Sequence, residues 1–128
     1  MIVCVSPNPA IDRHIFIPGY AEGGVFRPKN ILVTPGGKGI NVVRAIHALG
    51  GEALNTGFLG GHNGHYIDEN LEEEGLPSKW TYLPEGETRV DVIFVDPEKN
   101  LTTVANEPGP NVTTQDWHNL ESDILSSA

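Results

Sequence analysis

The chain has 128 residues, of which 38% are hydrophobic, and this length suits one folding unit with its own core rather than two ordinary domains. Its formal net charge of −9 argues against a nucleic-acid partner, because binding to a phosphate backbone needs a basic surface. No apolar segment approaches the roughly 20 residues of a membrane helix, and no basic segment precedes the first apolar run, so we expect a cytoplasmic protein without a membrane partner.

Short apolar runs and turn-forming residues alternate in the first part of the chain. Residues 2–5 are apolar and are followed by Ser-Pro-Asn-Pro, which predicts a short buried strand. Two β-prone runs, at 14–17 and 30–33, predict two further strands. Between residues 39 and 50 the apolar positions recur at i, i+3, i+4 and i+7, and this period predicts a helix.

The second part first continues the alternation, with a strand, a helix and a strand expected at residues 53–59, 63–74 and 80–83. This order predicts a parallel sheet with right-handed crossovers. Two β-prone runs joined by Asp-Pro-Glu-Lys-Asn then predict a hairpin. A final helix is expected at about 113–125, with Thr113 or Thr114 as its N-cap.

Four β-prone runs fall outside the alternation of strands and helices. We expect them to form one small sheet, separate from the parallel core, and they are residues 15–17, 31–33, 88–95 and 101–105. Such a sheet would leave apolar surface and open edges, so we also expect a homodimer formed through it.

A glycine-rich segment, Pro35-Gly-Gly-Lys-Gly-Ile-Asn41, leads directly into the first predicted helix. Glycines let backbone N–H groups approach a ligand, and a helix N-terminus favours negatively charged or electron-rich oxygen. Lys38 adds a positive charge. The segment lacks the G-x-x-x-x-G-K-[ST] pattern of a Walker A loop. The alternative interpretation is a loop-to-helix turn with one solvated lysine.

Two further charged residues are candidates for binding a sugar or its phosphate. Asp12 follows the first strand, and a carboxylate can accept two sugar hydroxyls at once. Its alternative is a turn aspartate beside Arg13. Arg89 stands at the start of a hairpin strand and can bind a phosphate through two N–H groups, or it is an exposed arginine at a strand edge. The histidines have no convincing third ligand, so no metal site is expected.

Four motifs, taken in order, resemble the PfkB-type (ribokinase-like) sugar kinases. They are Asn8-Pro-Ala-Ile-Asp12, the segment from Pro35 to Ala45, Glu87-Thr-Arg89 and Asn106-Glu-Pro-Gly-Pro110. The first and last are similar to the branch that holds 1-phosphofructokinase and tagatose-6-phosphate kinase. The resemblance implies an α/β fold with a Rossmann-type parallel sheet and a small β-sheet lid, whose strands would lie within 12–34 and 87–106.

The same resemblance implies roles for seven residues. Asp12, Gly37, Lys38, Gly39 and Asn41 would contact the sugar, and Arg27, Lys38 and Arg89 its phosphate. Arg27 is included for its expected place in the second lid strand. No catalytic residue is implied, because the Gly-Ala-Gly-Asp signature that carries the family's general base is absent from the sequence.

Residues 1–128 are therefore expected to be the N-terminal part of such a kinase domain, without its ATP-binding and catalytic half. The leading hypothesis is an ATP-dependent kinase that phosphorylates a ketohexose phosphate, with fructose 1-phosphate, tagatose 6-phosphate and fructose 6-phosphate left open. ATP and Mg²⁺ would serve the full-length enzyme and would not bind this portion tightly. The alternative is a non-catalytic module that binds a sugar phosphate or dimerises through its lid.

Overall fold

The computed structural model describes residues 1–127 and contains two sheets. The first is the expected parallel sheet, built from β1 (Ile2–Ser6), β4 (Ala53–Leu59) and β5 (Ser78–Tyr82) in the order β1-β4-β5. All three strands were predicted from their apolar runs, and β4 has the predicted bounds. β1 lies at one edge of this sheet, and Ile2 and Val5 are exposed, so the prediction that this strand is buried is wrong.

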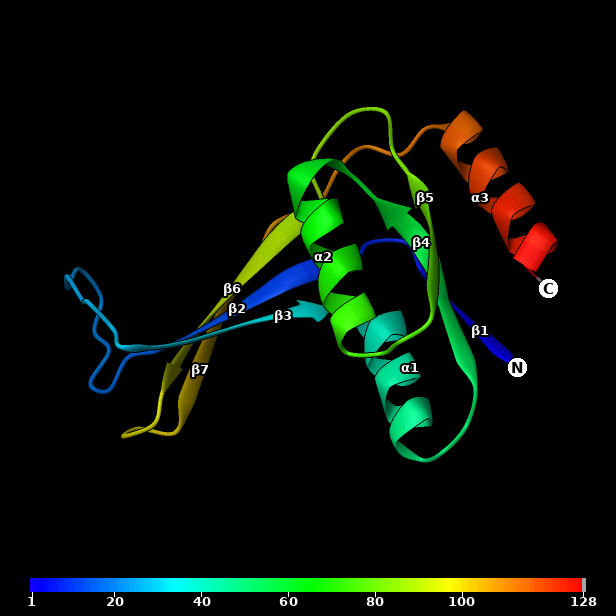
Figure 1. Cartoon of the computed structure of the whole chain (residues 1–128). Coiled ribbons are helices and arrows are strands. Elements are labelled where there is room, and N and C mark those ends of the chain that lie inside the picture. Colours follow the sequence, from blue (N-terminus) through cyan, green and yellow to red (C-terminus); the bar gives the residue numbers. More distant parts are fainter. Residues whose placement is uncertain (128) are drawn as a thin grey trace.

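Helices cover both faces of the parallel sheet. α1 (Lys38–Ala48) and α2 (Gly61–Glu73) pack on one face, where Ile40, Val43, Ile67 and Leu71 join Leu59 in the larger core cluster. α3 (Thr114–Ser127) packs on the other face, where Leu120 meets Phe58. Figure 1 shows this arrangement, with α3 on the side of the sheet away from α2. Neighbouring residues 58 and 59 point to opposite faces, because side chains alternate along a strand.

The second sheet contains the four runs that the sequence places outside the alternation, so that prediction is confirmed. Its strands are β2 (Ala10–Phe16), β3 (Asn30–Gly36), β6 (Arg89–Asp96) and β7 (Leu101–Asn106), in the order β3-β2-β6-β7. β2 and β6 are parallel, whereas the two outer pairs are antiparallel. Figure 1 shows this small sheet projecting away from the parallel one.

Both β2 and β3 are longer than predicted. β2 begins at Ala10, four residues before the expected run, and β3 continues through Pro35 to Gly36. Proline and glycine are poor strand formers, so the local sequence predicts that the strand beginning at residue 30 ends before Pro35. The extra residues matter because Ala10 pairs with Gly36, and this pairing brings two of the motifs together.

The ends of α2 and α3 show two ways of satisfying free backbone N–H groups. Thr113 is one of the two residues predicted as the N-cap of α3, and its Oγ1 accepts a hydrogen bond from the Asp116 N–H at 3.1 Å. In α2 the cap is remote: the carboxylate of Glu87 accepts from the N–H groups of His62 and Asn63, both at 3.0 Å. Within residues 1–127 no helix is long and apolar enough to span a membrane.

Candidate functional site

Three of the four motifs meet around one residue, Ala10. Its Cα pairs with Gly36 of β3 on one side and with Arg89 of β6 on the other. The motif that ends at Asp12, the glycine-rich segment and the arginine motif are therefore neighbours in space, although they span about 80 positions of the sequence. This junction lies where the small sheet joins the parallel sheet, beside the carboxyl end of β1.

Asp12 lies on β2 with Thr34 and Asp91 as its partners on the adjacent strands. A side chain at Gly36 would collide with the Asp12 carboxylate, so the glycine leaves room for the carboxylate in its present position. Burial raises the pKa of Asp12, and the neighbouring Asp91 raises that pKa further. The neighbouring side chains of His14, Arg89 and Arg44 oppose this rise in the pKa of Asp12 without cancelling it. The result is a half-buried acceptor with a pKa above its usual value.

The glycine-rich segment lies against the end of β1. A Cβ at Gly37 would be 3.3 Å from Pro9 Cα, and a Cβ at Gly39 would collide with Ser6 Oγ. Gly37 has a φ of 122° and is the N-cap of α1, where no side chain caps the helix. The N–H groups of the first turn of α1 therefore have no side-chain acceptor, which leaves them available to an electron-rich ligand.

Lys38 and Asn41, the other two candidate binding residues of this segment, lie at the same end of α1 as the glycines. Lys38 is the first residue of α1 and is exposed. Asn41 accepts a hydrogen bond at Oδ1 from Arg44 Nη1 at 3.0 Å, and Arg44 also binds Glu74 and the Pro35 carbonyl. Arg44 thus holds the Asn41 side chain and the start of the glycine segment together.

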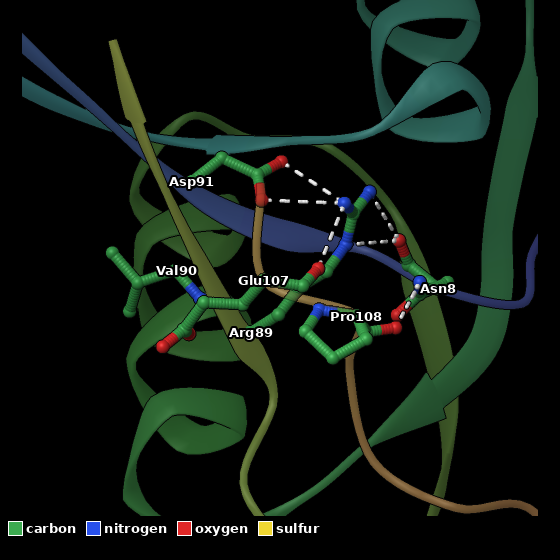
Figure 2. A network of polar contacts seen from close by, with 6 residues as sticks. All are labelled: Asn8, Arg89, Val90, Asp91, Glu107 and Pro108. Atoms are coloured by element: carbon green, nitrogen blue, oxygen red, sulfur yellow. Dashed lines mark hydrogen bonds and ion pairs between the residues drawn. The ribbon is translucent and has the colours of Figure 1, made fainter. Parts of the chain in front are cut away.

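Arg89 is the most densely bonded residue of the junction, as Figure 2 shows. Its Nε and Nη2 donate to the Asn8 carbonyl at 3.2 and 3.1 Å, and its Nη1 forms an ion pair with Asp91 at 3.2 Å. Nη1 also lies 3.5 Å from the Glu107 carbonyl. Since β6 is a central strand and the Arg89 side chain is only 18% exposed, the alternative of an exposed arginine at a strand edge is wrong.

Sequence reasoning missed the residues that surround Arg89. Asp91 is 6% exposed, and the Glu107 carboxylate accepts from the Val90 N–H at 2.6 Å. Asn8 reaches the Pro108 carbonyl through its side chain at 3.1 Å. Asn8 and Glu107 belong to the first and last of the four motifs, but their hydrogen bonds with Arg89 span 81 and 18 positions, so no local pattern could reveal them.

Ser6 was also missed. It ends β1, it is 2% exposed, and its Oγ has no hydrogen-bond partner among the described residues. Because Ser6 Oγ lies directly beside Gly39, it borders the start of α1. The only available signal was its position directly after the first apolar run, because open α/β sheets bind ligands at the carboxyl ends of their strands.

Arg27 does not lie in this junction. It precedes β3, which begins at Asn30, so its expected place in the second lid strand is wrong. It lines a cavity of about 780 Å³ together with Phe16, Phe26 and Pro97 at the other end of the small sheet. At about 3.3 Å per strand residue, the six steps from Ala10 to Phe16 place that cavity about 20 Å from the Arg89 end. The convergence of the Lys38 and Arg89 side chains on one anion stays a prediction.

Comparison with known proteins identifies the family. Residues 5–128, almost the entire chain, match the family described as “pfkB family carbohydrate kinase”. The chain belongs to the PfkB family of carbohydrate kinases. It is 36% identical over 123 residues to a 1-phosphofructokinase of Haloferax volcanii, a match that covers 94% of this chain and 39% of that protein.

Two further PfkB relatives are also similar over nearly all of this chain. A tagatose-6-phosphate kinase of Staphylococcus epidermidis is 30% identical, over 98% of this chain and 39% of that protein. The structure of phosphofructokinase-2 from Escherichia coli in complex with fructose-6-phosphate is similar, with a TM-score of 0.90 and 26% identity over 98% of this chain and 41% of that one. The chain thus spans about two fifths of the length of these relatives. Its fold is that of the PfkB structures, as the sequence predicted.

Proposed function

We propose that this chain is the sugar-phosphate-binding, N-terminal part of an ATP-dependent PfkB kinase that phosphorylates a ketohexose phosphate to the bisphosphate. One observation carries the proposal. The Asp12 carboxylate lies over Gly36, at the position where a side chain would collide with it, next to the start of α1. Paired acceptors and donors of this kind suit the hydroxyl groups of a sugar.

Different residues of the junction bind different parts of the sugar phosphate. Asp12 accepts hydrogen bonds from sugar hydroxyls, and the backbone N–H groups at Gly37 and Gly39 donate to sugar oxygens. Lys38 and Arg89 attract the phosphate of the substrate. This arrangement orients the acceptor sugar, which is the larger part of what an enzyme must do in phosphoryl transfer.

The names of the relatives support fructose 1-phosphate as the first substrate to test. The Haloferax 1-phosphofructokinase shares more identical residues with this chain than the tagatose-6-phosphate kinase does, at 36% against 30%. Fructose 6-phosphate and tagatose 6-phosphate are the other two candidates. All three carry a phosphate and several free hydroxyls, so each can use both parts of the junction.

The described residues do not fit a Mg²⁺ site. Residues 1–127 contain no group of three His, Cys, Asp or Glu side chains that could hold a metal ion. The two adjacent carboxylates of the junction, Asp12 and Asp91, lie beside the positive Arg89, which disfavours a divalent cation. We propose that ATP and Mg²⁺ bind within the part of the relatives' length that this chain does not span, and we expect no ADP release by this chain alone.

A thermal-shift panel tests the proposal. Because a ligand that binds only the native state raises the melting temperature, fructose 1-phosphate should stabilise the wild-type chain more than fructose does. In Lys38→Ala the extra stabilisation by the phosphate should shrink, by about 1.5–3 kcal/mol of binding free energy for a lost charged contact. The matched control is Lys79→Ala, which removes an exposed lysine of β5. Equal shifts for all sugars in all variants would contradict the proposal.

A homodimer formed through the small sheet is a second part of the proposal. Leu32 and Val104 are both 51% exposed, and the register places them in one row with His14 and Ile93 across the four strands. This exposed row favours self-association. A chain that dimerises without binding any sugar would support the alternative of a non-catalytic dimerisation module.

The cellular location is a separate part of the proposal. The single cysteine, Cys4, is free, which agrees with a cytoplasmic location because reducing compartments keep thiols unpaired.

A further inference from the structure

The Arg89 guanidinium has almost no donor left for a ligand. Arginine has five N–H groups. Nε and one Nη2 N–H are taken by the Asn8 carbonyl, and the two on Nη1 face the Asp91 carboxylate and the Glu107 carbonyl. Within residues 1–127, one N–H on Nη2 lacks an acceptor. A phosphate therefore cannot bind Arg89 through two free N–H groups while the network of Figure 2 is intact.

Asp91 is the partner that matters for an anion. Both of its carboxylate oxygens lie 3.2 Å from Arg89 Nη1, and the side chain is nearly buried. The carbonyl oxygens of Asn8 and Glu107 are neutral, so they occupy donors without repelling a phosphate. The Asp91 carboxylate occupies a donor and also repels a phosphate. It neutralises the guanidinium and places a negative charge next to the negatively charged phosphate.

The register places a second carboxylate beside the first. Asp12 and Asp91 are directly paired on the parallel strands β2 and β6, and side chains of paired residues lie on the same face of a sheet. Sugar hydroxyls gain from these two acceptors, whereas a phosphate does not. The junction is thus built to favour the polyhydroxyl part of a ligand over its phosphate part.

We infer that Asp91 is a specificity-determining residue, whose carboxylate competes with a ligand phosphate for Arg89 and so limits how much the phosphate contributes to binding. The part of this inference that concerns sugars rests on the proposed function. The competition itself concerns any small phosphate. A phosphate must displace or share the ion pair, and a ligand that also offers hydroxyls to Asp12 is the one that can do so.

Asp91→Asn separates competition from simple positioning. Asparagine keeps an oxygen that accepts from Arg89 Nη1, so the guanidinium stays in place, but the negative charge is gone. Competition predicts that phosphate binds more tightly in this variant, by about tenfold, which is the size expected for removing one charge about 6 Å from a doubly charged phosphate even at the dielectric constant of water. A purely structural role for Asp91 predicts equal or weaker binding.

The test uses inorganic phosphate as the probe at low, constant ionic strength. The Nε–H signal of Arg89 is followed by NMR and is assigned by its loss in Arg89→Lys. We expect the dissociation constant for phosphate to fall about tenfold in Asp91→Asn and to stay unchanged in Glu73→Gln, which removes one exposed charge from α2. Unchanged or weaker phosphate binding in a folded Asp91→Asn overturns the inference, and so does the absence of binding in both proteins.

A second titration keeps this result distinct from the proposed function. Fructose 1-phosphate and fructose are titrated into the same proteins, and Asp91→Asn should gain affinity for the first only. If fructose 1-phosphate binds neither protein while inorganic phosphate binding is strengthened, the proposed function fails and the competition stands. If fructose 1-phosphate binds both proteins equally, the competition fails and the function stands. Should Asp91→Asn not fold, Asp91→Ser removes the same charge and is judged by the same outcomes.

Discussion

At the scale of single residues, the binding role proposed for Asp12 and the stability of the folded chain oppose each other. Burial and the neighbouring Asp91 raise the pKa of its carboxyl group, so the ionised form that would bind hydroxyls is disfavoured by the folded chain. The native state then binds more protons than the unfolded state between the ordinary pKa of aspartate and the raised one. By linkage, the free energy of unfolding falls as the pH rises through this window.

Asp12→Asn should therefore stabilise the chain at pH 7. We expect a gain of about 0.5–1 kcal/mol in the free energy of unfolding, at the low end for a removed unfavourable charge because solvent still screens a half-buried group. The gap between variant and wild type should narrow as the pH falls through the raised pKa of Asp12, and it should close below about pH 4, where aspartate is protonated in the unfolded chain as well. Urea denaturation at several pH values measures this, and a less stable variant at pH 7 would contradict it.

The same residue shows what the sequence reveals about a site. Asp12, Gly37 and Gly39 could be proposed because they belong to contiguous motifs at the end of a strand and the start of a helix. Asp91 could not, because its importance comes from an ion pair with Arg89 and a register opposite Asp12. The parallel pairing of β2 with β6 is a tertiary feature that neither strand encodes alone.

At the scale of elements, the contact between β1 and β4 depends on Gly57. Its φ is +148°, and a Cβ there would collide with the Ser6 carbonyl oxygen and lie 2.6 Å from the carbonyl carbon. Both neighbours are backbone atoms of a paired strand, so they cannot move aside. Glycine inside a strand often marks such a close approach of two backbones.

Gly57→Ala should cost about 3 kcal/mol or more of unfolding free energy, because it adds a clash with backbone to an unfavourable φ. The matched control is Gly50→Ala, since Gly50 also has a positive φ, at +83°, but open space around its Cβ position. That change should cost about 1–2 kcal/mol through φ alone. Denaturation midpoints with unchanged slopes provide the comparison, and equal losses for the two variants would show that the clash is relieved.

The elements also show where prediction from sequence succeeds. The apolar run of β4 sets both of its bounds, and the period of α1 places that helix to within two residues at either end, because both signals are local. The start of α2 at Gly61 was placed two residues late, since its cap is the Glu87 carboxylate from far along the chain. Segments whose ends depend on remote partners are the ones that local reasoning misplaces.

At the scale of the whole molecule, the small sheet has one face with both the site and exposed apolar side chains. Asp12 and Asp91 share this face with His14 and Ile93, and Leu32 and Val104 extend the second row to the outer strands. A partner covering this row would lie next to the binding junction. Self-association and ligand binding are therefore expected to influence each other.

The double variant Leu32→Asp/Val104→Asp tests the dimer. We expect the wild-type chain to be dimeric in sedimentation equilibrium at tens of micromolar, and the variant to be monomeric, because two buried charges would face each other across the contact. Leu49→Asp is the control, since Leu49 is 88% exposed at the end of α1 and should leave the dimer intact. A wild-type chain that stays monomeric at every concentration would contradict this expectation.

The central claim is that the junction around Ala10 binds a sugar phosphate, and one measurement tests it directly. Fructose 1-phosphate is titrated into the isotope-labelled chain, and the backbone N–H signals are followed by NMR. We predict that the signals of Asp12, Gly37, Gly39 and Asn41 move together with one dissociation constant, and that Asp12→Asn weakens this binding at least tenfold. Shifts confined to another part of the chain, or none with any of the three sugar phosphates, would contradict the account.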